Sequence, residues 1–554
     1  MASRVQKSMR NAITGAIGLF VNLIVQFIAR SFFIRILGVE YNGVNGLFSN
    51  ILQVLNLAEL GFAGAVAYAL YKPLKEHDEE TVAALMRYFV RVYRIIAIIV
   101  AVVGAACIPF LQYLISEDIS ELPFSLPELR IYFSLYLINT VCSYLLAYKR
   151  TIITADQDAY IVSSVDNIGN ICLNIIQIVL LYLTKNFYAY LSIMIAKTVV
   201  NNLIIHIIAS KRYPYLAKYK QASLDNAIKK QLYRNIRALF CHKIGTVIIV
   251  STSSIVLSAM VSIVDAGKYS NYTMVTGGVT SFIAVLFNGI TASIGNLCVD
   301  GNAEYQYIVF KRVAYISYFL FTFTFVCFVC LFNDFIQIWL GREMQFDLPV
   351  VVAISLNASI LYLRNTVLTF KDAMGIYRQD LFKPIVEAIV GIGLAIGLGF
   401  VWGTFGVVIG YTIATIVIAI PVESFVLFKF GLKRSAAGYF VRTLLDVVLT
   451  VCLTALTYYI CSFIPDGIGL FILEFCFVVI FAAVIFLLLT CRTTEFKYYV
   501  SLVKQMVRKI FRRETAVSMA NAESDSVDEK QLSDAEHDEK VEDEAKNEQI
   551  DHRS

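Results

Sequence analysis

The sequence predicts an all-α, polytopic membrane protein with about fourteen transmembrane helices, arranged as two groups of six and an appended pair. Of its 554 residues, 58% are hydrophobic and only 16% are charged, with a mean hydropathy of +0.68. A water-soluble globule could not cover so much apolar surface. The apolar residues recur in blocks of about twenty, the length of a helix that crosses about 30 Å of hydrocarbon. These observations exclude a soluble enzyme.

The elements follow from the apolar blocks in chain order. The first block comes after Arg4, Lys7 and Arg10. It is too long for the core of a cleavable signal and lacks a small-residue cleavage site, so we expect it to be retained. The predicted helices cover residues 11–37, 42–70, 83–114, 129–148, 159–183, 187–210, 237–263, 270–297, 308–333, 349–370, 384–402, 404–428, 441–463 and 467–490.

Basic residues gather at every second connection between these helices, which is typical of cytoplasmic loops. The basic connections hold Lys72 and Lys75; Lys149 and Arg150; Lys211, Arg212, Lys218, Lys220, Lys229 and Lys230; Lys311 and Arg312; Lys371, Arg378 and Lys383; and Lys433 and Arg434. The intervening connections hold only Arg130, Lys185, Lys268 and Arg342. The alternation predicts a multi-pass protein with both termini in the cytoplasm.

The longest inner connection divides the first twelve helices into six and six. We therefore predict an N-terminal six-helix lobe at 1–212, a cytoplasmic linker at 213–236, a C-terminal six-helix lobe at 237–430 and an additional helix pair at 431–491. Each half carries an acid near the inner end of its fifth helix, at Asp166 and Glu387. This echo is typical of the internal duplication found in many transporters.

The C-terminal segments differ from the membrane body. Residues 492–513 place apolar side chains on one helical face and basic side chains mostly elsewhere, which predicts an interfacial helix on the anionic inner leaflet. Residues 514–554 hold 14 acidic and 4 basic residues and no aromatic residue. Such a segment buries too little apolar area to offset its ordering entropy, so it is predicted to be a disordered acidic tail.

No motif predicts a catalytic residue, cofactor, metal or nucleic-acid site. The chain lacks a nucleotide-binding P-loop. Cys327 and Cys330 lie inside an apolar block without a second pair, which favours membrane packing over redox or zinc chemistry. Asp156 and Asp158 form a DxD before the fifth helix, where an acidic N-cap is the favoured interpretation over a metal site.

Polar stripes inside the predicted helices are the informative signal. Groups of this kind are costly against lipid, so each stripe must face another helix or water. The stripes comprise Asn22, Gln26 and Arg30 on helix one; Asn45, Ser49, Gln53, Asn56 and Glu59 on helix two; Asp166, Asn167, Asn170, Asn174 and Gln177 on helix five; and Lys197 and Asn201 on helix six. All four helices belong to the first half, which predicts a polar cavity bordered by that lobe.

Two interpretations of these residues remain open. The neutral residues either line the cavity or only join helices. For Arg30 and Lys197 a cavity is favoured, because a cation deep in a span needs an anion or water. Arg35 either joins them or reaches the outer interface, and Arg364 is expected to reach the inner interface. Glu59 and Asp166 are either ion-coupling sites or, as favoured, structural partners of the cations.

Four stretches carry a family resemblance: ILGVEYNGVNGLFSNILQVLNLAELGF at 36–62, ALYKPL at 69–74, TADQDAY at 154–160 and ASIGNLCVDGN at 292–302. They resemble Wzx-type polysaccharide flippases, members of the multidrug/oligosaccharidyl-lipid/polysaccharide (MOP) exporter superfamily. The resemblance covers residues 1–490 at the level of the helix pattern.

This resemblance implies two six-helix lobes around a central cavity with a cationic lumen. It also implies alternating-access movement of an undecaprenyl-type diphosphate-linked oligosaccharide across the bacterial cytoplasmic membrane. The implied partners are membrane lipids, this substrate and polysaccharide-assembly enzymes.

Two rival functions are considered. A drug/cation antiporter of the same superfamily would favour an acidic, aromatic-lined cavity, whereas the deep charges here are mixed. A membrane polysaccharide polymerase or ligase would be expected to use a large outer loop. The longest predicted outer loop, 116–128, is brief and lacks an evident catalytic group.

Overall fold

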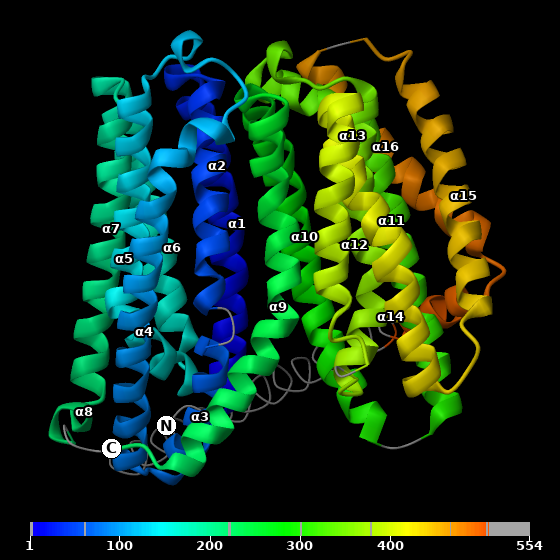
Figure 1. The fold of residues 1–554 in the computed structure, drawn as a ribbon. Coiled ribbons are helices and arrows are strands. Elements are labelled where there is room, and N and C mark those ends of the chain that lie inside the picture. Colours follow the sequence, from blue (N-terminus) through cyan, green and yellow to red (C-terminus); the bar gives the residue numbers. More distant parts are fainter. Residues whose placement is uncertain are drawn as a thin grey trace, which may run out of the picture. The chain divides into compact units, whose positions relative to one another are not determined.

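The computed structural model describes residues 4–59, 62–219, 223–299, 302–376, 379–465, 467–505 and 508, and within these residues the regular secondary structure is helical (Figure 1). The α-helices are α1 (Arg4–Leu37), α2 (Val39–Leu55), α3 (Phe62–Glu76), α4 (Glu79–Cys107), α5 (Leu126–Ala155), α6 (Ala159–Thr184), α7 (Phe187–Arg212), α8 (Tyr215–Lys218), α9 (Asn226–Met260), α10 (Ile263–Val299), α11 (Ala303–Leu340), α12 (Leu348–Ala373), α13 (Lys383–Ala414), α14 (Ile420–Val426), α15 (Ala437–Cys461) and α16 (Ile468–Thr490). Short 3-10 helices lie at Asn56–Glu59, Ile108–Leu114, Ile119–Glu121 and Arg342–Met344, and π-helices at Thr415–Ala419 and Leu427–Leu432.

The helices confirm the predicted class of polytopic membrane protein. Each of the fourteen predicted ranges falls mostly on helical residues in the described part of the chain, with non-helical residues near the ends of 237–263, 441–463 and 467–490. Among the described residues, nine helices are long and apolar enough to cross a membrane, and a bent pair within α5 would add a tenth. One of the nine, Lys383–Leu432, is 50 residues long. A straight helix of that length would extend about 75 Å, more than twice the hydrocarbon thickness.

A sharp reversal at Gly403 explains this long segment. Gly403 has φ 55° and ψ −135°, a conformation that glycine adopts without steric cost. The two arms then pack against each other through glycines. A Cβ at Gly406 would lie 2.0 Å from the carbonyl oxygen of Leu398, and one at Gly410 would lie 2.6 Å from the backbone nitrogen of Ala395. The structure therefore confirms the predicted helix boundary between residues 402 and 404.

The second predicted helix, 42–70, is not continuous. It ends at Leu55, continues as a 3-10 turn over Asn56–Glu59 and resumes as α3 at Phe62. The turn is held by two tyrosine hydroxyls from neighbouring helices. Tyr144 donates to Asn56 Oδ1 and Tyr93 to Glu59 Oε1, each at 2.6 Å. Asn56 and Glu59, which the sequence analysis placed in one polar stripe of a continuous helix, therefore lie in the 3-10 turn and accept hydrogen bonds there.

Local capping fixes where α5 begins. Ser125 and Glu128 form a capping box, in which the Ser125 backbone N–H donates to the Glu128 carboxylate at 2.8 Å. The Ser125 hydroxyl also donates to this carboxylate, and together these bonds lower the pKa of Glu128.

The range predicted as a linker, 213–236, is partly helical. Helix α8 and the start of α9 both lie within it. Helix α9 begins eleven residues earlier than its predicted start at 237.

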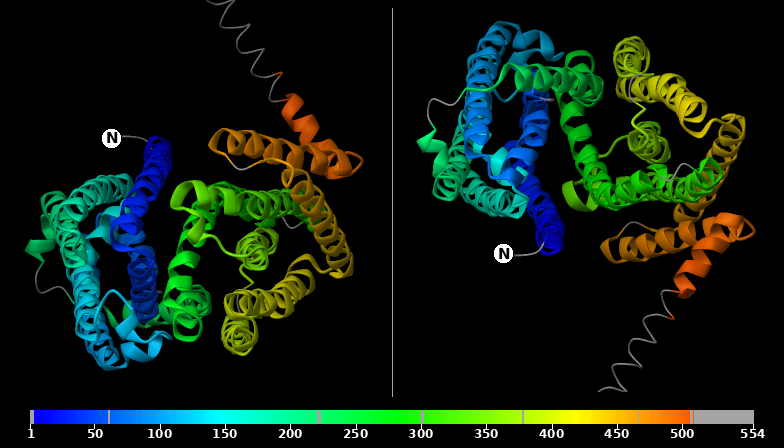
Figure 2. Two further views of the ribbon diagram at one scale, coloured as in Figure 1. Left: turned by 90° about the horizontal axis from the view of Figure 1, so that it is seen from above. Right: turned by 90° about the horizontal axis from the view of Figure 1, so that it is seen from below.

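The helices of residues 1–483 belong to one compact unit, within which they form two bundles that share two helix pairings (Figure 2). In the first bundle, α1 packs on α6 and α4 on α5; in the second, α9 packs on α13 and α11 on α12. By chain order these are helices one and five, and three and four, of each half. The repeated pairing supports the predicted internal duplication. Helix α2 packs mainly on α9 and α10 and so joins the bundles, while α15 packs on α11.

The described residues from Val484 onward belong to a second unit. Its described residues continue α16 to Thr490 and include a helix over 494–505, inside the range predicted as an interfacial helix, 492–513. The predicted acidic tail, 514–554, lies outside the described residues.

We expect the two ends of the first bundle to lie on opposite sides of the membrane. In a cysteine-free background, Asp118→Cys should react with a membrane-impermeant maleimide in intact cells, because its loop is an outer connection. Lys218→Cys, at the end of α8, should react only after permeabilisation. Equal labelling of both sites in intact cells would contradict the predicted orientation.

Candidate functional site

A polar cluster lies within the first bundle, where α5, α6 and α7 meet. Arg150 Nη1 lies 2.5 Å from Asp166 Oδ2, and Arg150 Nε donates to Asn202 Oδ1 at 3.1 Å. Asn201 Nδ2 donates to the other Asp166 oxygen at 3.5 Å. The sequence predicted that Asp166 would pair with a cation. It placed Arg150 in an inner loop, whereas the structure makes Arg150 the direct partner.

Lys197 is half-buried beside this pair on α7. The charges of Asp166 and Arg150 both act on its ammonium. Across the part of the chain that the structure describes, however, no carboxylate oxygen lies within 4 Å of Lys197 Nζ. Because Asp166 is already paired with Arg150, Lys197 is the cation of this cluster that keeps its charge available for an anion.

The neutral residues of the predicted stripes mostly join helices. Asn22 is buried, and its Nδ2 donates to Asn167 Oδ1 on α6 at 2.7 Å, while its Oδ1 accepts no hydrogen bond in the described structure. Gln177 is also buried and donates to the Tyr190 carbonyl at 3.0 Å. Asn174 bonds within its own helix, to the Asn170 carbonyl at 2.7 Å.

Three residues of the predicted stripes are exposed, namely Gln26 on α1 and Ser49 and Gln53 on α2. Arg35, on α1, is exposed as well. Arg35 lies in the last turn of α1, three residues before the break at Gly38. Its position at the helix end is that expected of a side chain reaching the interface. The structure thus does not bring Arg35 together with Lys197 in one contact.

Arg30 lies where the two bundles meet. Its Nη1 donates to Asn42 Oδ1 on α2 and to Ser270 Oγ on α10, the latter at 3.1 Å. Both partners are neutral, and among the described residues no carboxylate lies within 4 Å of the guanidinium. Arg30 is therefore a half-buried cation with hydrogen-bond partners but no counter-charge.

The junction around Arg30 is a close crossing of α2 and α10 at two glycines. A Cβ at Gly43 would lie 2.1 Å from the Ile263 carbonyl oxygen, and a Cβ at Gly267 would lie 2.5 Å from the Val39 carbonyl oxygen. Asn42 Nδ2 donates to the Gly267 carbonyl at 2.7 Å across the crossing. The two contacts are reciprocal: Gly43 faces Ile263, four positions before Gly267, and Gly267 faces Val39, four positions before Gly43.

Replacing Gly267 with valine should force α2 and α10 apart, because there is no space for the added atoms. Spin labels at Glu121 and Arg342, at exposed positions of the two bundles, should then report a longer distance than in the parental protein. Gly393→Val is the matched control, because a Cβ there meets no atom within 4 Å. An unchanged distance in the Gly267 variant would contradict a glycine-dependent junction.

Glu59 has a different partner from the one predicted. It accepts the Tyr93 hydroxyl, and no cation of the described residues forms an ion pair with it. The interpretation of Glu59 as a partner of Arg30 or Lys197 is therefore wrong, because Glu59 lies in the 3-10 turn after α2 and faces α4.

Sequence reasoning missed a buried charge cluster in the second bundle, formed by Arg364, Lys383, Glu387 and Glu423. Arg364 lies 2.8 Å from Glu423 and 3.4 Å from Glu387, and Lys383 lies 3.0 Å from Glu387 and also pairs with Glu423. The exposed fraction is 1% for the Glu423 side chain and 13% for that of Arg364. The prediction that Arg364 reaches the inner interface is therefore wrong. Glu423, an acid inside an apolar block, was the available signal.

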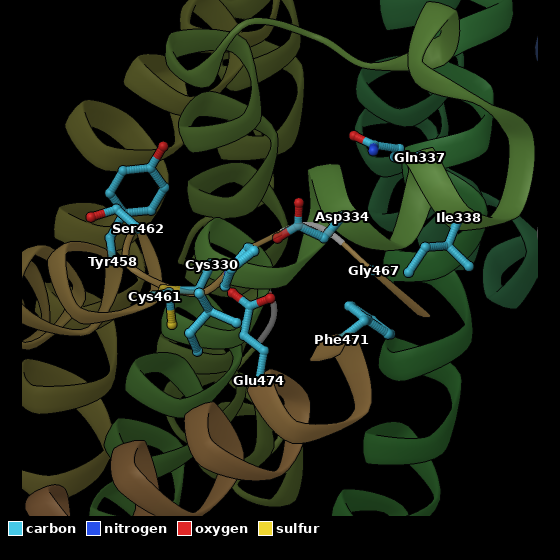
Figure 3. A pocket seen from close by; sticks show the side chains of 12 residues that line it. Cys330, Asp334, Gln337, Ile338, Tyr458, Cys461, Ser462, Gly467, Phe471 and Glu474 are labelled. Carbon is cyan, nitrogen blue, oxygen red and sulfur yellow. The ribbon is translucent and has the colours of Figure 1, made fainter. Parts of the chain in front are cut away.

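A second feature of this half is a cavity of about 230 Å³ between α11, α15 and α16 (Figure 3). Asp334 and Glu474 line it together with Gln337, Tyr458 and Ser462. Among the described residues that line it there is no lysine or arginine. The chemistry of this cavity therefore suits a cationic or hydroxyl-bearing group better than a phosphate.

The DxD motif pairs with basic and phenolic groups. Asp158 occupies the N-cap position of α6, yet its side chain makes no capping bond and instead pairs with Arg212. Asp156 accepts the Tyr213 hydroxyl at 2.9 Å. The capping interpretation is therefore wrong: the motif ties the start of α6 to the end of α7. Within the described residues, no group of three or more potential metal ligands was found.

No family model matches the chain, and no curated protein matches it either. Solved structures do match. The lipid II flippase MurJ in an inward closed conformation has a TM-score of 0.59 at 14% identity, covering 86% of this chain and 99% of that one. An inward-facing multidrug resistance MATE family transporter of the MOP superfamily has a TM-score of 0.57 at 13% identity, covering 76% and 99%.

A mutant of the Vibrio cholerae MATE transporter VcmN gives a TM-score of 0.51 at 12% identity, covering 77% of this chain and 98% of that one. The chain shares the fold of these three proteins. The shared fold extends over 76–86% of this chain and nearly all of each matched chain. The fold agrees with the superfamily named in the sequence analysis, and the Wzx-type resemblance stays a prediction.

Proposed function

We propose that the chain moves a lipid-linked oligosaccharide across the bacterial cytoplasmic membrane by alternating access between its two bundles. The observation that carries the proposal is that two cations inside spanning helices lack an acidic partner among the described residues. Arg30 and Lys197 have no carboxylate within 4 Å among the described residues, whereas Arg150, Arg364 and Lys383 are paired with acids. Unpaired cations at this depth suit an anionic substrate, and a diphosphate supplies the missing charge.

The position of Arg30 links binding to movement. It lies at the junction of the bundles and bonds residues of both α2 and α10. A phosphate that withdrew the guanidinium from Asn42 and Ser270 would weaken the junction, so occupancy would bias one arrangement of the bundles over another. In this proposal, Asn22, Gln26, Asn170, Asn174 and Gln177 provide polar surface or helix contacts rather than charge.

The test is the lipid-linked intermediate that accumulates when the gene is removed. We expect an undecaprenyl-type diphosphate-linked oligosaccharide to accumulate and to disappear on complementation. Copurification of polysaccharide-assembly enzymes would identify the expected partners. A deletion strain with unchanged lipid-linked oligosaccharides and unchanged surface glycan would contradict the proposal.

A drug/cation antiporter is the second candidate, favoured by the acidic cavity between α11, α15 and α16. The described residues of its lining include two carboxylates and no basic side chain, which suits a cationic substrate. Replacing Asp334 and Glu474 with the corresponding amides should then abolish efflux of cationic dyes. Unchanged dye retention on removal of the gene would count against this candidate.

A further inference from the structure

A second cavity, also of about 230 Å³, lies in the first bundle near the ends of α5 and α7. It is half open, and its lining residues come from α4, α5, α7 and α8 and from the connection between α7 and α8. Figure 1 shows α8 at the end of α7. Lys149 lies six residues before the end of α5, and Ser210 lies two residues before the end of α7. The charge pattern predicts that this end faces the cytoplasm, so the cavity would lie near the inner leaflet.

Lys149 is the group in this cavity that needs explanation. Only 8% of the residue is exposed. Its Nζ donates to Ser210 Oγ and lies 3.3 Å from His206 Nε2. Neither hydroxyl nor imidazole supplies negative charge to a lysine, and no carboxylate of the described residues lies within 4 Å of Nζ. A buried cation without a counter-charge is costly, so an external anion would stabilise it.

The rest of the lining indicates what kind of anion fits. Arg87 of α4 adds a second basic side chain to the lining. Most other lining side chains are apolar, among them Met86, Val90 and Leu216. A small inorganic anion would gain nothing from these apolar surfaces. An amphiphile that carries a phosphate next to glycerol and acyl groups would use both kinds of surface.

We propose that this cavity binds the phosphate of an anionic phospholipid from the adjacent leaflet, with Lys149 and Arg87 as the phosphate-binding residues. Basic pockets between transmembrane helices at the cytoplasmic side are suited to such head groups. The site is separate from Arg30 and Lys197 and does not depend on the proposed transport function. It would fix the α4–α5–α7 corner of the first bundle to the membrane.

The test uses the full-length protein in nanodiscs of phosphatidylcholine and a fluorescent phosphatidylglycerol as the titrated probe. Lys149→Gln keeps a polar side chain able to bond Ser210 but removes the charge. We expect it to bind the probe about tenfold more weakly, the loss expected for one charged hydrogen bond. Lys149→Arg should bind like the parental protein. The matched control is Lys72→Gln, a basic residue predicted on the same side, whose side chain is 81% exposed.

Three outcomes would overturn the proposal. The first is parental affinity in both Lys149→Gln and Arg87→Gln, each checked by its melting temperature. The second is equal binding of a fluorescent phosphatidylcholine, which would make the site non-specific for anionic lipid. The third is displacement of the probe by inorganic phosphate at the same concentration as unlabelled phosphatidylglycerol requires. That result would assign the site to a free anion. If Lys149→Gln fails to fold, the Arg87→Gln titration decides.

Discussion

Arg30→Ala is expected to abolish transport of lipid-linked oligosaccharide while the protein still inserts into the membrane. The variant removes a cation that binds neutral groups of α2 and α10 and has no acidic partner among the described residues. A hydrogen bond to a charged group contributes about 1.5–3 kcal/mol, so its loss should weaken substrate binding roughly ten- to a hundredfold. Lys197→Ala should have the same effect. Transport into the outer leaflet and the amount of membrane-inserted protein are the two measurements.

A matched variant separates the charge of Arg30 from its role in the junction. Asn42→Ala removes the bonds from Asn42 to Arg30, Gly267 and Asn271 but leaves the guanidinium in place. We expect it to change the spin-label distance between the bundles and to retain more transport than Arg30→Ala. Equal loss of transport in both variants would show that Arg30 acts through the junction rather than through the substrate.

The double variant Arg30→Ala with Glu59→Gln is expected not to regain activity. A rescue would require a salt bridge between the two residues, whereas Glu59 bonds Tyr93. Arg30→Lys addresses the geometry of the contact. It should retain activity if a point charge is sufficient, and lose it if a bidentate fork is needed.

Glu423→Ala is expected to destabilise the second bundle strongly. The substitution leaves Arg364 and Lys383 buried with only Glu387 to neutralise them. Breaking a buried ion pair from one side costs about 3–5 kcal/mol, because the remaining charge is uncompensated. We expect a large fall in the melting temperature of the detergent-solubilised protein, measured by fluorescence-detected unfolding.

The control for this prediction is Glu304→Ala. Glu304 also pairs with an arginine, Arg434, but the side chains are 64% and 41% exposed. Exposed pairs contribute about 0–1 kcal/mol, so this variant should melt near the parental temperature. Replacing Arg364 and Glu423 together by leucine should recover much of the loss, because the Lys383–Glu387 pair remains neutral. Equal melting of Glu423→Ala and Glu304→Ala would contradict a structural role for the cluster.

The helix pattern could be predicted because it depends only on the order of apolar and polar residues along the chain. A span needs a run of apolar residues of fixed length, and the runs are visible in the sequence. The division of Lys383–Leu432 into two helices near Gly403 was predicted for the same reason, since a largely apolar segment of 50 residues is too long for one span. The break after Leu55 was not predicted, because hydropathy does not register a turn held by Tyr93 and Tyr144 from other helices.

The candidate site was predicted only in part, because the partners of a charged side chain depend on how the helices pack. A deep charge is visible in the sequence, and Arg30, Lys197 and Asp166 were recognised from it. Their partners lie far along the chain: Ser270 is 240 positions from Arg30, and Glu423 is 59 from Arg364. Arg150 was placed in a loop because it lies near a helix end, although it is the partner of Asp166.

The most direct test of the transport proposal is a flipping assay with the purified protein in proteoliposomes. A lipid-linked oligosaccharide is incorporated in both leaflets, and a membrane-impermeant glycosidase digests what reaches the outer surface. The account predicts that the parental protein exposes the inner-leaflet pool to digestion. Proteoliposomes with Arg30→Ala or Lys197→Ala should lose only the outer-leaflet pool, like protein-free liposomes. If the glycosidase digests only the outer-leaflet pool in proteoliposomes that contain the parental protein, the proposed function is contradicted.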